Sequence, residues 1–575
     1  MTLGNHSIRR RFTCTLAVAA LAGSLVACQS DKKPYGSVPK GETKPPTAAS
    51  APAPTPTDAE ARQRALDKLT AAAASKNQPG QSSPPAPPKG TTAPGTTKPN
   101  TTAPTETAAC TDQYKRIRKV FDALPEKFYN ADPGLSMRVD AGIKECRSYL
   151  TGCLTAPQPK AEVQAMLGKF LFTMSAVRKA EWQTALGAQY KGRELAERVN
   201  AMNHRYMGEV VKLTTAATQA LPKESQLRGR ALMILGQAAT QSKTHDQAIQ
   251  AYDTFVKDFK GEKDLEERAR AVAGLAAAYR EAGEFDLGIA LIEGSLKELY
   301  NTRIYPFLLD GLYKLQLAKG DLAGMLQASK TVITVLPLKL ETTSFTDRER
   351  QSIESLVVFH GFRRGYAQFA MGDMEEARKS FGQHIESVNA KEAKLTRSGQ
   401  GLPPAWKIYR DRSMSNLAFL DELAERPAPH DLDLGSSWVS KGRSLPESRG
   451  QVSALLFRRV GDERSAPFLE EVHQICAADP TLDMSTVAFI RSEATIAQEF
   501  DEMRQELQEL GYEGAAGFDP DFANKTAFRS FHAMIGSATF VIVDATGNLA
   551  WFQQDPRRQD VNFAKSILKR IASGG

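Results

Sequence analysis

The 575-residue sequence lacks the residue patterns on which most metal and thiol chemistry depends. None of its six cysteines forms a Cys-x-x-Cys pair, and none of its eight histidines forms a His-x-x-Glu-His pattern. These are common spacings of zinc and redox sites, so the usual sequence evidence for such sites is missing. We therefore expect no metal and no other cofactor.

The charge balance also gives little support for nucleic-acid binding. The chain has a formal net charge of +8 and a pI near 9.0, but part of the excess lies in its N-terminal segment. No run of Lys and Arg interleaved with aromatic residues follows that segment, although nucleic-acid binding usually depends on such a basic patch. We therefore expect no nucleic-acid partner.

A short apolar segment near the N-terminus indicates where the chain is located. Three arginines at 9–11 precede an apolar stretch at 12–26, which is too short to span a bilayer as a helix. The stretch ends in Leu-Val-Ala followed by Cys28. This arrangement resembles a bacterial lipoprotein signal, here residues 1–27. The resemblance implies cleavage before Cys28 and lipidation of its thiol, so that a lipid anchor holds the mature chain in a membrane.

Two other interpretations of this segment stay open. The segment is also compatible with an ordinary secretory signal in which Cys28 has no role, and weakly with a twin-arginine signal. Among lipoproteins, an aspartate after the cysteine usually marks retention in the inner membrane, and here Gln29 follows it. The resemblance therefore implies the cell envelope, at the periplasmic face of the outer membrane, without deciding between the periplasm and the cell exterior.

Residues 28–109 have the composition of a flexible tether. They are rich in Pro, Thr, Ala, Ser and Lys and contain few large apolar side chains. Such a segment cannot bury enough apolar surface to offset its loss of conformational entropy, so we expect it to be disordered. As a flexible coil it would reach about 50 Å.

The next region, 110–227, is expected to be helical and contains three of the four cysteines that remain after Cys14 and Cys28. We expect helices at 114–128 and 135–150 to pack antiparallel across a turn at 130–134. Cys110 and Cys153 then lie at similar distances from the turn. A disulfide between them is the preferred pairing, Cys110 with Cys146 comes next, and free buried thiols stay open.

Residues 228–426 show self-similar helical units. Small residues at the helix seam, a Gly after the first helix and a larger apolar residue in the second helix recur. These positions are Leu235, Gly236, Ala239, Ala248, Tyr252 and Phe255 in the first unit, Leu275, Ala276, Tyr279, Gly283, Phe285, Gly288 and Ile292 in the second, Leu312, Gly320 and Val332 in the third, and Gly365, Gln368, Gly372, Ala377 and Phe381 in the fourth.

This pattern resembles the tetratricopeptide repeat, although the copies are spaced more widely than 34 residues. The resemblance implies a curved stack of helical hairpins that binds a protein or peptide. Arg363, Arg364 and Tyr366 are candidates for the lining of its groove, and a solvated helix face is the alternative. A compact helical domain without a bound partner also stays open.

The pattern changes to alternating strands and helices in residues 432–575, which predicts an α/β domain. Strands are expected at 452–460, 486–491, 538–544 and 549–553, and helices at 466–478, 493–510 and 560–571. The phrase Thr-Phe-Val-Ile-Val-Asp at 539–544, with Gly547 after it, resembles the exported thioredoxin-like proteins of the TlpA and peroxiredoxin type. We expect this domain to have its own core and the repeats to fold without it.

The chemistry of that family requires residues that this chain lacks. A thioredoxin needs a reactive thiolate and a resolving cysteine at the start of the first helix. The corresponding loop at 458–465 contains no cysteine. Ala538 stands where the resemblance places a cis-proline, and Cys476 lies too far along the helix to replace the missing thiol. The degenerate site consists of Gly461, Asp462, Glu463, Arg464, Ser465 and Ala538.

The sequence therefore predicts a multidomain lipoprotein with a disordered tether, a tetratricopeptide-like array and a redox-inactive thioredoxin-like domain. We identify no catalytic residue and expect a scaffold or adaptor that binds protein partners in the cell envelope, in the assembly of an envelope machine. The alternative, implied by the fold resemblance, is a thiol-disulfide oxidoreductase or a peroxiredoxin-like antioxidant enzyme.

Replacing Cys28 with Ser should release the protein from the membrane fraction. The reason is that no later segment of the sequence is an apolar run of membrane-spanning length. Fractionation of cell envelopes in high salt, with Cys476→Ser as the matched control, measures this. A Cys28→Ser protein that stays with the membranes would contradict the lipid anchor.

Overall fold

The computed structural model describes residues 103–124, 133–153, 157–190, 192–261, 265–422, 439, 450–488, 496–519 and 538–574. The predicted signal, Cys28 and most of the predicted tether lie outside the described residues. The chain divides into two compact units, Met1–Arg178 and Lys179–Gly575.

The first unit contains helix α2 (Ala103–Asp122), helix α3 (Pro133–Gly152) and most of helix α4 (Pro157–Leu186). Phe121 of α2 packs edge-on against Phe170 of α4, with ring centroids 6.1 Å apart. Residues 103–109 were predicted as tether but form the first turns of α2, because proline is tolerated there and alanine favours helix.

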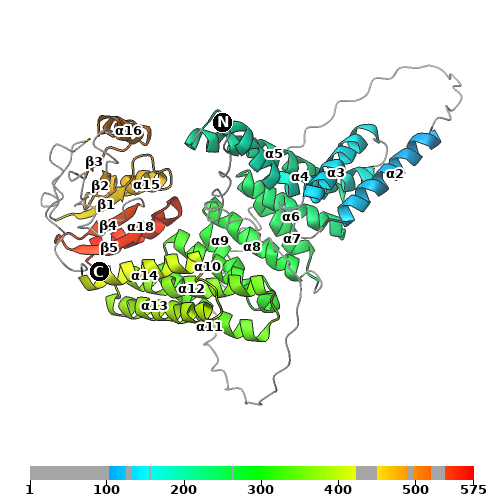
Figure 1. Ribbon diagram of the computed structural model, residues 1–575. Helices are drawn as coiled ribbons and strands as arrows, with labels where there is room; N and C mark the ends of the chain where they lie inside the picture. The colour runs from blue at the N-terminus through cyan, green and yellow to red at the C-terminus, as the bar shows by residue number, and fades with distance from the viewer. Residues whose placement is uncertain are drawn as a thin grey trace, which may run out of the picture. The chain divides into compact units, whose positions relative to one another are not determined.

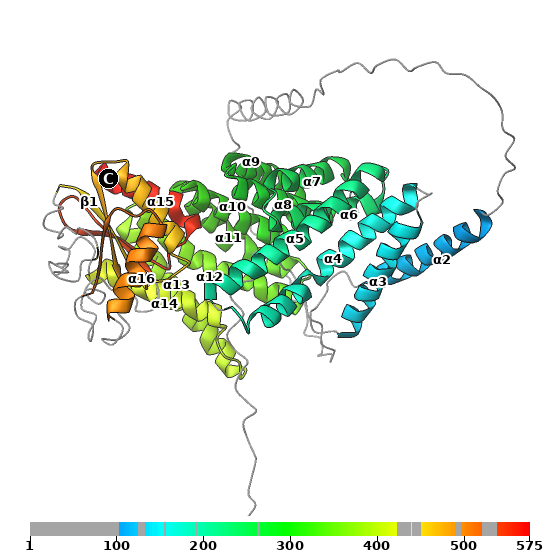
Figure 2. The same ribbon diagram turned by 90° about the horizontal axis from the view of Figure 1, so that it is seen from above.

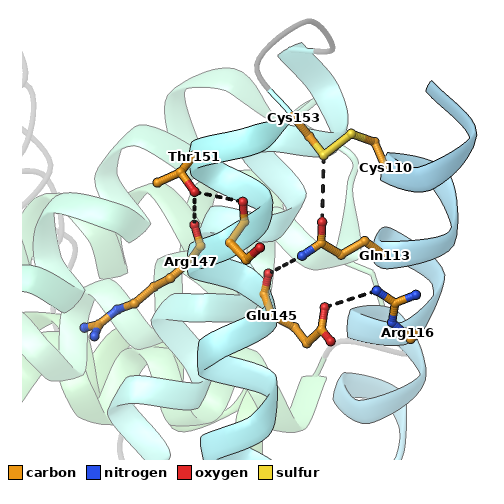
Figure 3. Close-up of a disulfide and its surroundings, with 8 residues drawn as sticks. Cys110, Gln113, Arg116, Glu145, Arg147, Thr151 and Cys153 are labelled. Atoms are coloured by element: carbon orange, nitrogen blue, oxygen red, sulfur yellow. Dashed lines mark hydrogen bonds and ion pairs between the residues drawn. A yellow bond between two sulfur atoms is a disulfide. The ribbon is translucent and has the colours of Figure 1, made fainter. Parts of the chain in front are cut away.

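A disulfide joins the two antiparallel helices α2 and α3 near one end (Figure 3). It links Cys110 to Cys153, whose Cα atoms are 5.9 Å apart. Next to it, Gln113 Nε2 donates to the carbonyl oxygen of Glu145 at 3.1 Å. Cys146 is buried as a free thiol.

The second unit begins with helix α5 (Gly192–Ala220) and continues as four helical hairpins within the described residues (Figure 2). The hairpins are α6 (Gln226–Gln241) with α7 (His245–Asp258), α8 (Leu265–Ala282) with α9 (Phe285–Ser295), α10 (Tyr305–Lys319) with α11 (Leu322–Thr342), and α12 (Asp347–Ala370) with α13 (Met374–Arg397). A short 3₁₀ helix, η2 (Glu298–Asn301), precedes α10, and helix α14 (Pro404–Glu422) follows α13.

Left-handed residues close the turns within these hairpins. Gly283, Gly320 and Gly372 have φ angles of 81°, 78° and 84° and end the first helices of the last three hairpins. Glycine adopts this conformation without the strain that a Cβ brings, which is why it recurs at this position. In the first hairpin Lys243 takes the same conformation, with φ 55°.

The first helices of the hairpins form one continuous layer. α6 contacts α8, α8 contacts α10, α10 contacts α12, and α12 contacts α14. The second helices pack against this layer from the other side of each hairpin. We call the set α6, α8, α10, α12 and α14 the first-helix layer.

A five-stranded mixed sheet forms the C-terminal domain. Its strands are β1 (Val452–Arg458), β2 (Leu482–Ala488), β3 (Ala515–Phe518), β4 (Thr539–Val543) and β5 (Leu549–Gln554), in the order β3-β2-β1-β4-β5. The first three strands are parallel, and β4 is antiparallel to both β1 and β5. The helices are α15 (Ala466–Ala477), α16 (Ile496–Glu509), the 3₁₀ turn η6 (Arg558–Asp560) and α18 (Val561–Ala572).

This sheet corrects the sequence prediction in two places. β2 begins at Leu482 rather than at 486, because its polar residues Asp483 and Ser485 alternate with buried apolar ones and hide the start of the strand. β3 was not predicted, because four residues containing two alanines and a glycine carry little strand propensity. Parallel pairing with β2 stabilises β3 regardless of its composition.

The sheet domain and the repeats share one hydrophobic core, so the expectation that each has its own is wrong. Trp551 of β5 lies between Tyr366 and Phe369 of α12, with ring centroids 5.2 and 4.3 Å away. Phe552 stacks on Phe419 of α14 at 5.3 Å. Figure 1 shows β5 and α18 beside α10, α12 and α14. We call this contact the aromatic seam.

Helix α18 donates hydrogen bonds to the C-terminal ends of α10 and α12. Asn562 Nδ2 donates to the Ala318 carbonyl at 2.7 Å, and Arg570 Nε donates to the Ala370 carbonyl at 2.9 Å. These carbonyls lie in the last turns of α10 and α12, where no helical N–H follows to bind them. Removing the C-terminal domain would therefore expose both aromatic surface and unsatisfied helix ends.

The close packing of Tyr252 of α7 against glycines of α6 and α8 gives a stability test. The ring of Tyr252 lies so close to Gly236 and Gly274 that a Cβ on either would lie 2.6 or 2.5 Å from it. Gly236→Ala should therefore lower the free energy of unfolding by about 1–3 kcal/mol through overpacking. Urea denaturation of the purified protein measures it.

Gly382→Ala is the matched control for that substitution. Gly382 is also a helical glycine, but nothing lies within 4 Å of its Cβ position. Its replacement should leave stability unchanged or raise it by about 0.5–1 kcal/mol. Equal unfolding midpoints for the two variants would show that Tyr252 does not fill the space beside Gly236.

Candidate functional site

The loop after β1 is held in shape by its own polar groups. Ser465 Oγ donates to Asp462 Oδ2 at 2.6 Å, and the backbone N–H of Arg464 donates to Asp462 Oδ1 at 3.3 Å. Gly461 has a φ of 72°, and its N–H donates to Glu506 Oε2 at 3.2 Å. Ser465 itself is fully buried, so its hydroxyl is a structural group.

Ala538 lies opposite this loop, immediately before β4. Its carbonyl accepts a hydrogen bond of 2.7 Å from the N–H of Asp555. Asp555 has a left-handed backbone, with φ 53°. This conformation is uncommon for a residue with a side chain, although aspartate tolerates it better than most.

The loop and Ala538 enclose a mostly polar cavity of about 340 Å³. Its lining residues are Arg459, Val460, Gly461, Asp462, Arg464, Ala538 and Asp555. The structure thus brings together four of the six predicted site residues, while Ser465 lies beneath the loop and Glu463 faces elsewhere. Sequence reasoning did not single out Arg459 or Asp555. Asp555 follows β5 in the chain, and only the tertiary fold places it beside Ala538.

A second cavity of about 640 Å³ lies on the other side of Val460 and Gly461, which line both cavities. Of the described residues that line it, six are glutamates and none is Lys or Arg. The glutamates are Glu197 of α5, Glu463 and Glu470 near the start of α15, and Glu502, Glu506 and Glu509 of α16.

The two free thiols among the described residues are both buried. Burial raises the pKa of Cys476 to about 12, and it lies near the end of α15, away from the loop. Burial likewise raises the pKa of Cys146 to about 12. A thiol in this state is almost entirely protonated at neutral pH, so it is a poor nucleophile.

The prediction that Arg363 and Tyr366 line a binding groove is wrong, whereas Arg364 is half-buried and its prediction is not tested. Arg363 Nη1 pairs with Asp310 Oδ1 at 2.5 Å, and its guanidinium lies over the ring of Tyr313. Arg364 Nε donates to Ser380 Oγ of α13 at 3.0 Å. Tyr366 packs in the aromatic seam.

A buried Ser-His-Asp arrangement lies next to Arg363. His360 Nδ1 is 3.4 Å from Ser329 Oγ, and His360 Nε2 is 3.3 Å from Asp310 Oδ1. Ser329 and His360 are fully buried, and burial lowers the pKa of His360 to about 4. Burial alone would raise the pKa of Asp310, but the charges of Arg363 and Lys314 hold it well below its usual value. The arrangement thus joins buried side chains of α10, α11 and α12.

Asp560 is a buried carboxyl next to the aromatic seam. Its Oδ2 accepts from the N–H of Arg557 at 2.9 Å and from Gln553 Nε2 at 3.3 Å. Burial raises its pKa to about 6, although the N–H and the charge of Arg557 act in the opposite direction.

The described residues contain neither a metal-binding cluster nor a membrane-spanning helix. No group of three or more His, Cys, Asp or Glu side chains in this part of the chain is arranged to hold a metal ion. None of the helices in the same part is both long enough and apolar enough to cross a membrane.

Comparison with protein families identifies one repeat. The tetratricopeptide repeat family matches residues 361–387, which cover the second half of α12, the turn at Gly372 and the first half of α13. Repeats of this family are typical of protein–protein interaction. No curated protein sequence matches the chain with significance.

Several solved structures match a part of the chain at low sequence identity. The thioredoxin domain of a thiol-disulfide oxidoreductase from Bacteroides vulgatus is 14% identical, covers 26% of this chain and 97% of its own, and has a TM-score of 0.20. A putative thiol:disulfide interchange protein DsbE from Chlorobium tepidum is 15% identical, with 26% and 97% covered and a TM-score of 0.21. A secreted Mycobacterium tuberculosis disulfide oxidoreductase homologous to E. coli DsbE is 15% identical, with 22% and 86% covered and a TM-score of 0.18.

Asp560 gives a pH-dependence prediction. Because its pKa is higher in the folded protein (about 6) than in the unfolded chain, its contribution to stability is complete at low pH and is lost as pH rises through 6. Asp560→Asn keeps an acceptor oxygen but cannot ionise. It should raise the free energy of unfolding at pH 7 by about 1–3 kcal/mol and leave it nearly unchanged at pH 4.

Chemical denaturation at both pH values measures this difference, with the exposed Asp501→Asn as control. The control should change stability equally at both pH values. A loss of stability in Asp560→Asn at pH 7 would mean that the ionised carboxylate is the stabilising form.

Proposed function

We propose that this protein is a lipid-anchored scaffold of the cell envelope that binds protein partners through its helical repeats. The observation that carries the proposal is the division of the first-helix layer into a covered and a free part. The C-terminal domain covers α10, α12 and α14 through the aromatic seam. The same layer continues through α8 and α6, to which the C-terminal domain makes no comparable contact among the described residues.

Helix α5 packs against α6, and the part of α6 that stays accessible is one polar face. Gln226, Arg230, Gln237 and Gln241 are exposed and recur at the spacing of one helix face. A repeat array of this kind presents neighbouring helices as one extended surface, which suits a peptide or a protein. The C-terminal domain then fixes one end of the array and orients the free surface.

We further propose that the C-terminal domain acts in binding and not in thiol-disulfide exchange. Exchange requires an accessible thiolate, whereas the loop at 458–465 has no cysteine and the two free thiols are buried. The alternative, a thiol oxidoreductase or peroxiredoxin-like enzyme, requires one of these buried thiols to become exposed and ionised.

The location belongs to the proposal as well. The resemblance of residues 1–28 to a lipoprotein signal supports an anchor at Cys28 on the periplasmic face of the outer membrane. A flexible tether would let the repeats reach partners about 50 Å from the lipid surface.

Photo-crosslinking in the intact envelope tests the scaffold proposal. A photoreactive amino acid replaces Gln237, exposed on α6, or Gln250, exposed on α7 in the other layer. We expect a discrete crosslinked partner from position 237 and little or none from position 250. Equal crosslinking from both positions, or none from either, would contradict a partner surface on the first-helix layer.

Activity assays on the purified protein test the enzymatic alternative. Insulin reduction and peroxide consumption by the native protein should equal those of the Cys476→Ala variant and of buffer. Turnover that disappears in Cys476→Ala would show that the buried thiol is reactive and that the domain is an enzyme.

A further inference from the structure

The cavity beside Ala538 has an excess of positive charge because its carboxylates are already engaged. Asp555 Oδ2 pairs with Arg412 of α14 at 3.4 Å and with Arg557 at 2.8 Å. Asp462 accepts hydrogen bonds from Ser465 and from the backbone of the loop. Both carboxylates thus already have hydrogen-bond donors or cations beside them.

Two arginines that line the cavity have no such partner. Arg459 and Arg464 are exposed, and no side-chain hydrogen bond or ion pair joins either to another described residue. The described charged residues that line the cavity are two arginines (459 and 464) and two aspartates (462 and 555). Because Asp555 is already paired with Arg412 and Arg557, which lie outside the lining, the two lining arginines face Asp462 alone. The energetically favoured occupant of such a polar cavity is an anion.

We propose that this cavity binds a single carboxylate presented by a peptide partner, with Arg459 and Arg464 as its ligands. The guanidinium forms paired hydrogen bonds to the two oxygens of a carboxylate, which gives direction as well as charge. The volume of about 340 Å³ is large enough for one acidic side chain or one chain terminus. This binding deepens the scaffold function proposed above and rests on it.

The neighbouring acidic cavity restricts the ligand to one carboxylate. Six glutamates line it on the far side of Val460 and Gly461. One of the six, Glu506, is paired with Arg458. Like charges repel, and at physiological salt the repulsion is screened over a distance of about 8 Å. A polyacidic segment would meet this repulsion, whereas one carboxylate flanked by neutral residues would not.

Asp555 connects the cavity to the repeats. Its N–H binds the Ala538 carbonyl in the cavity wall, while its carboxylate pairs with Arg412 of α14. The left-handed backbone of Asp555 is thus held from both sides. A ligand in this cavity therefore lies against a wall that the first-helix layer itself supports.

Arginine footprinting on the full chain tests the proposal. Phenylglyoxal modifies accessible guanidiniums, and mass spectrometry gives the rate at each arginine. The probe is N-acetylglutamate N-methylamide, and its glutamine analogue is the neutral control at matched ionic strength. Arg397, exposed and without a described partner, reports non-specific protection.

We expect the carboxylate probe to slow modification of Arg459 and Arg464 about threefold, as occurs when a ligand is at twice its dissociation constant. Arg397 should be unaffected, and the glutamine analogue should protect none of the three. In an Arg464→Gln variant the protection of Arg459 should disappear, because one guanidinium alone holds a carboxylate weakly.

Three results would overturn the proposal. Protection of Arg397 to the same degree, or protection of Arg459 that persists in Arg464→Gln, would mean that the arginines act as independent surface groups. Stronger protection by inorganic phosphate than by the peptide-like probe would assign the cavity to a free anion. If the carboxylate probe protects neither Arg459 nor Arg464 while crosslinking at position 237 still occurs, the carboxylate site is rejected and the proposed scaffold function is retained.

Discussion

The packing of Trp551 between Tyr366 and Phe369 is the interaction on which the rest of the second unit depends. Trp551 is completely buried, although it belongs to a strand near the edge of the sheet. Its burial requires α12, and the burial of Phe369 requires β5 in return. Neither the repeats nor the sheet domain can keep its apolar surface from water without the other, so the two fold as one body with one core.

Helix α18 shows how an α/β domain fits a repeat array. Asn562 and Arg570 are eight residues apart, which corresponds to about 12 Å along a helix. Packed helices lie about 8–10 Å apart, so one helix can reach the ends of α10 and α12 at the same time. Glycine at 320 makes this approach possible, because a Cβ there would collide with the backbone of α18, whereas a Cβ at 372 would meet only the guanidinium of Arg570. The glycines that close the hairpin turns therefore also form the docking surface of the domain.

The candidate site depends on this arrangement. The loop after β1 and the residue before β4 meet at one end of the sheet because β1 and β4 are neighbours. The loop contains no cysteine. Its cavity is lined by Arg459 and Arg464, while the carboxylate of Asp555 is paired with other arginines. Arg412 supplies one of those pairs from the repeats, so the electrostatics of the cavity belong to both domains. The proposed binding surfaces on the repeats and in the cavity therefore belong to one folded body.

The sequence by itself determined the order of helical repeats and α/β domain, the glycines of the hairpin turns and the approximate places of α15, α16 and α18, because these follow from local periodicity and turn chemistry. It also singled out the loop at 461–465 and Ala538 as parts of one site, through a resemblance in residues 539–544. It missed β3, whose pairing is non-local. It also misassigned Arg363 and Tyr366, because the sequence pattern of a polar helix face does not show whether its side chains are exposed or buried. Only the tertiary structure decided that Asp555 supports Ala538, because the two residues belong to separate elements of the sheet. It also decided that the domains share a core, because that core depends on contacts between residues more than a hundred positions apart.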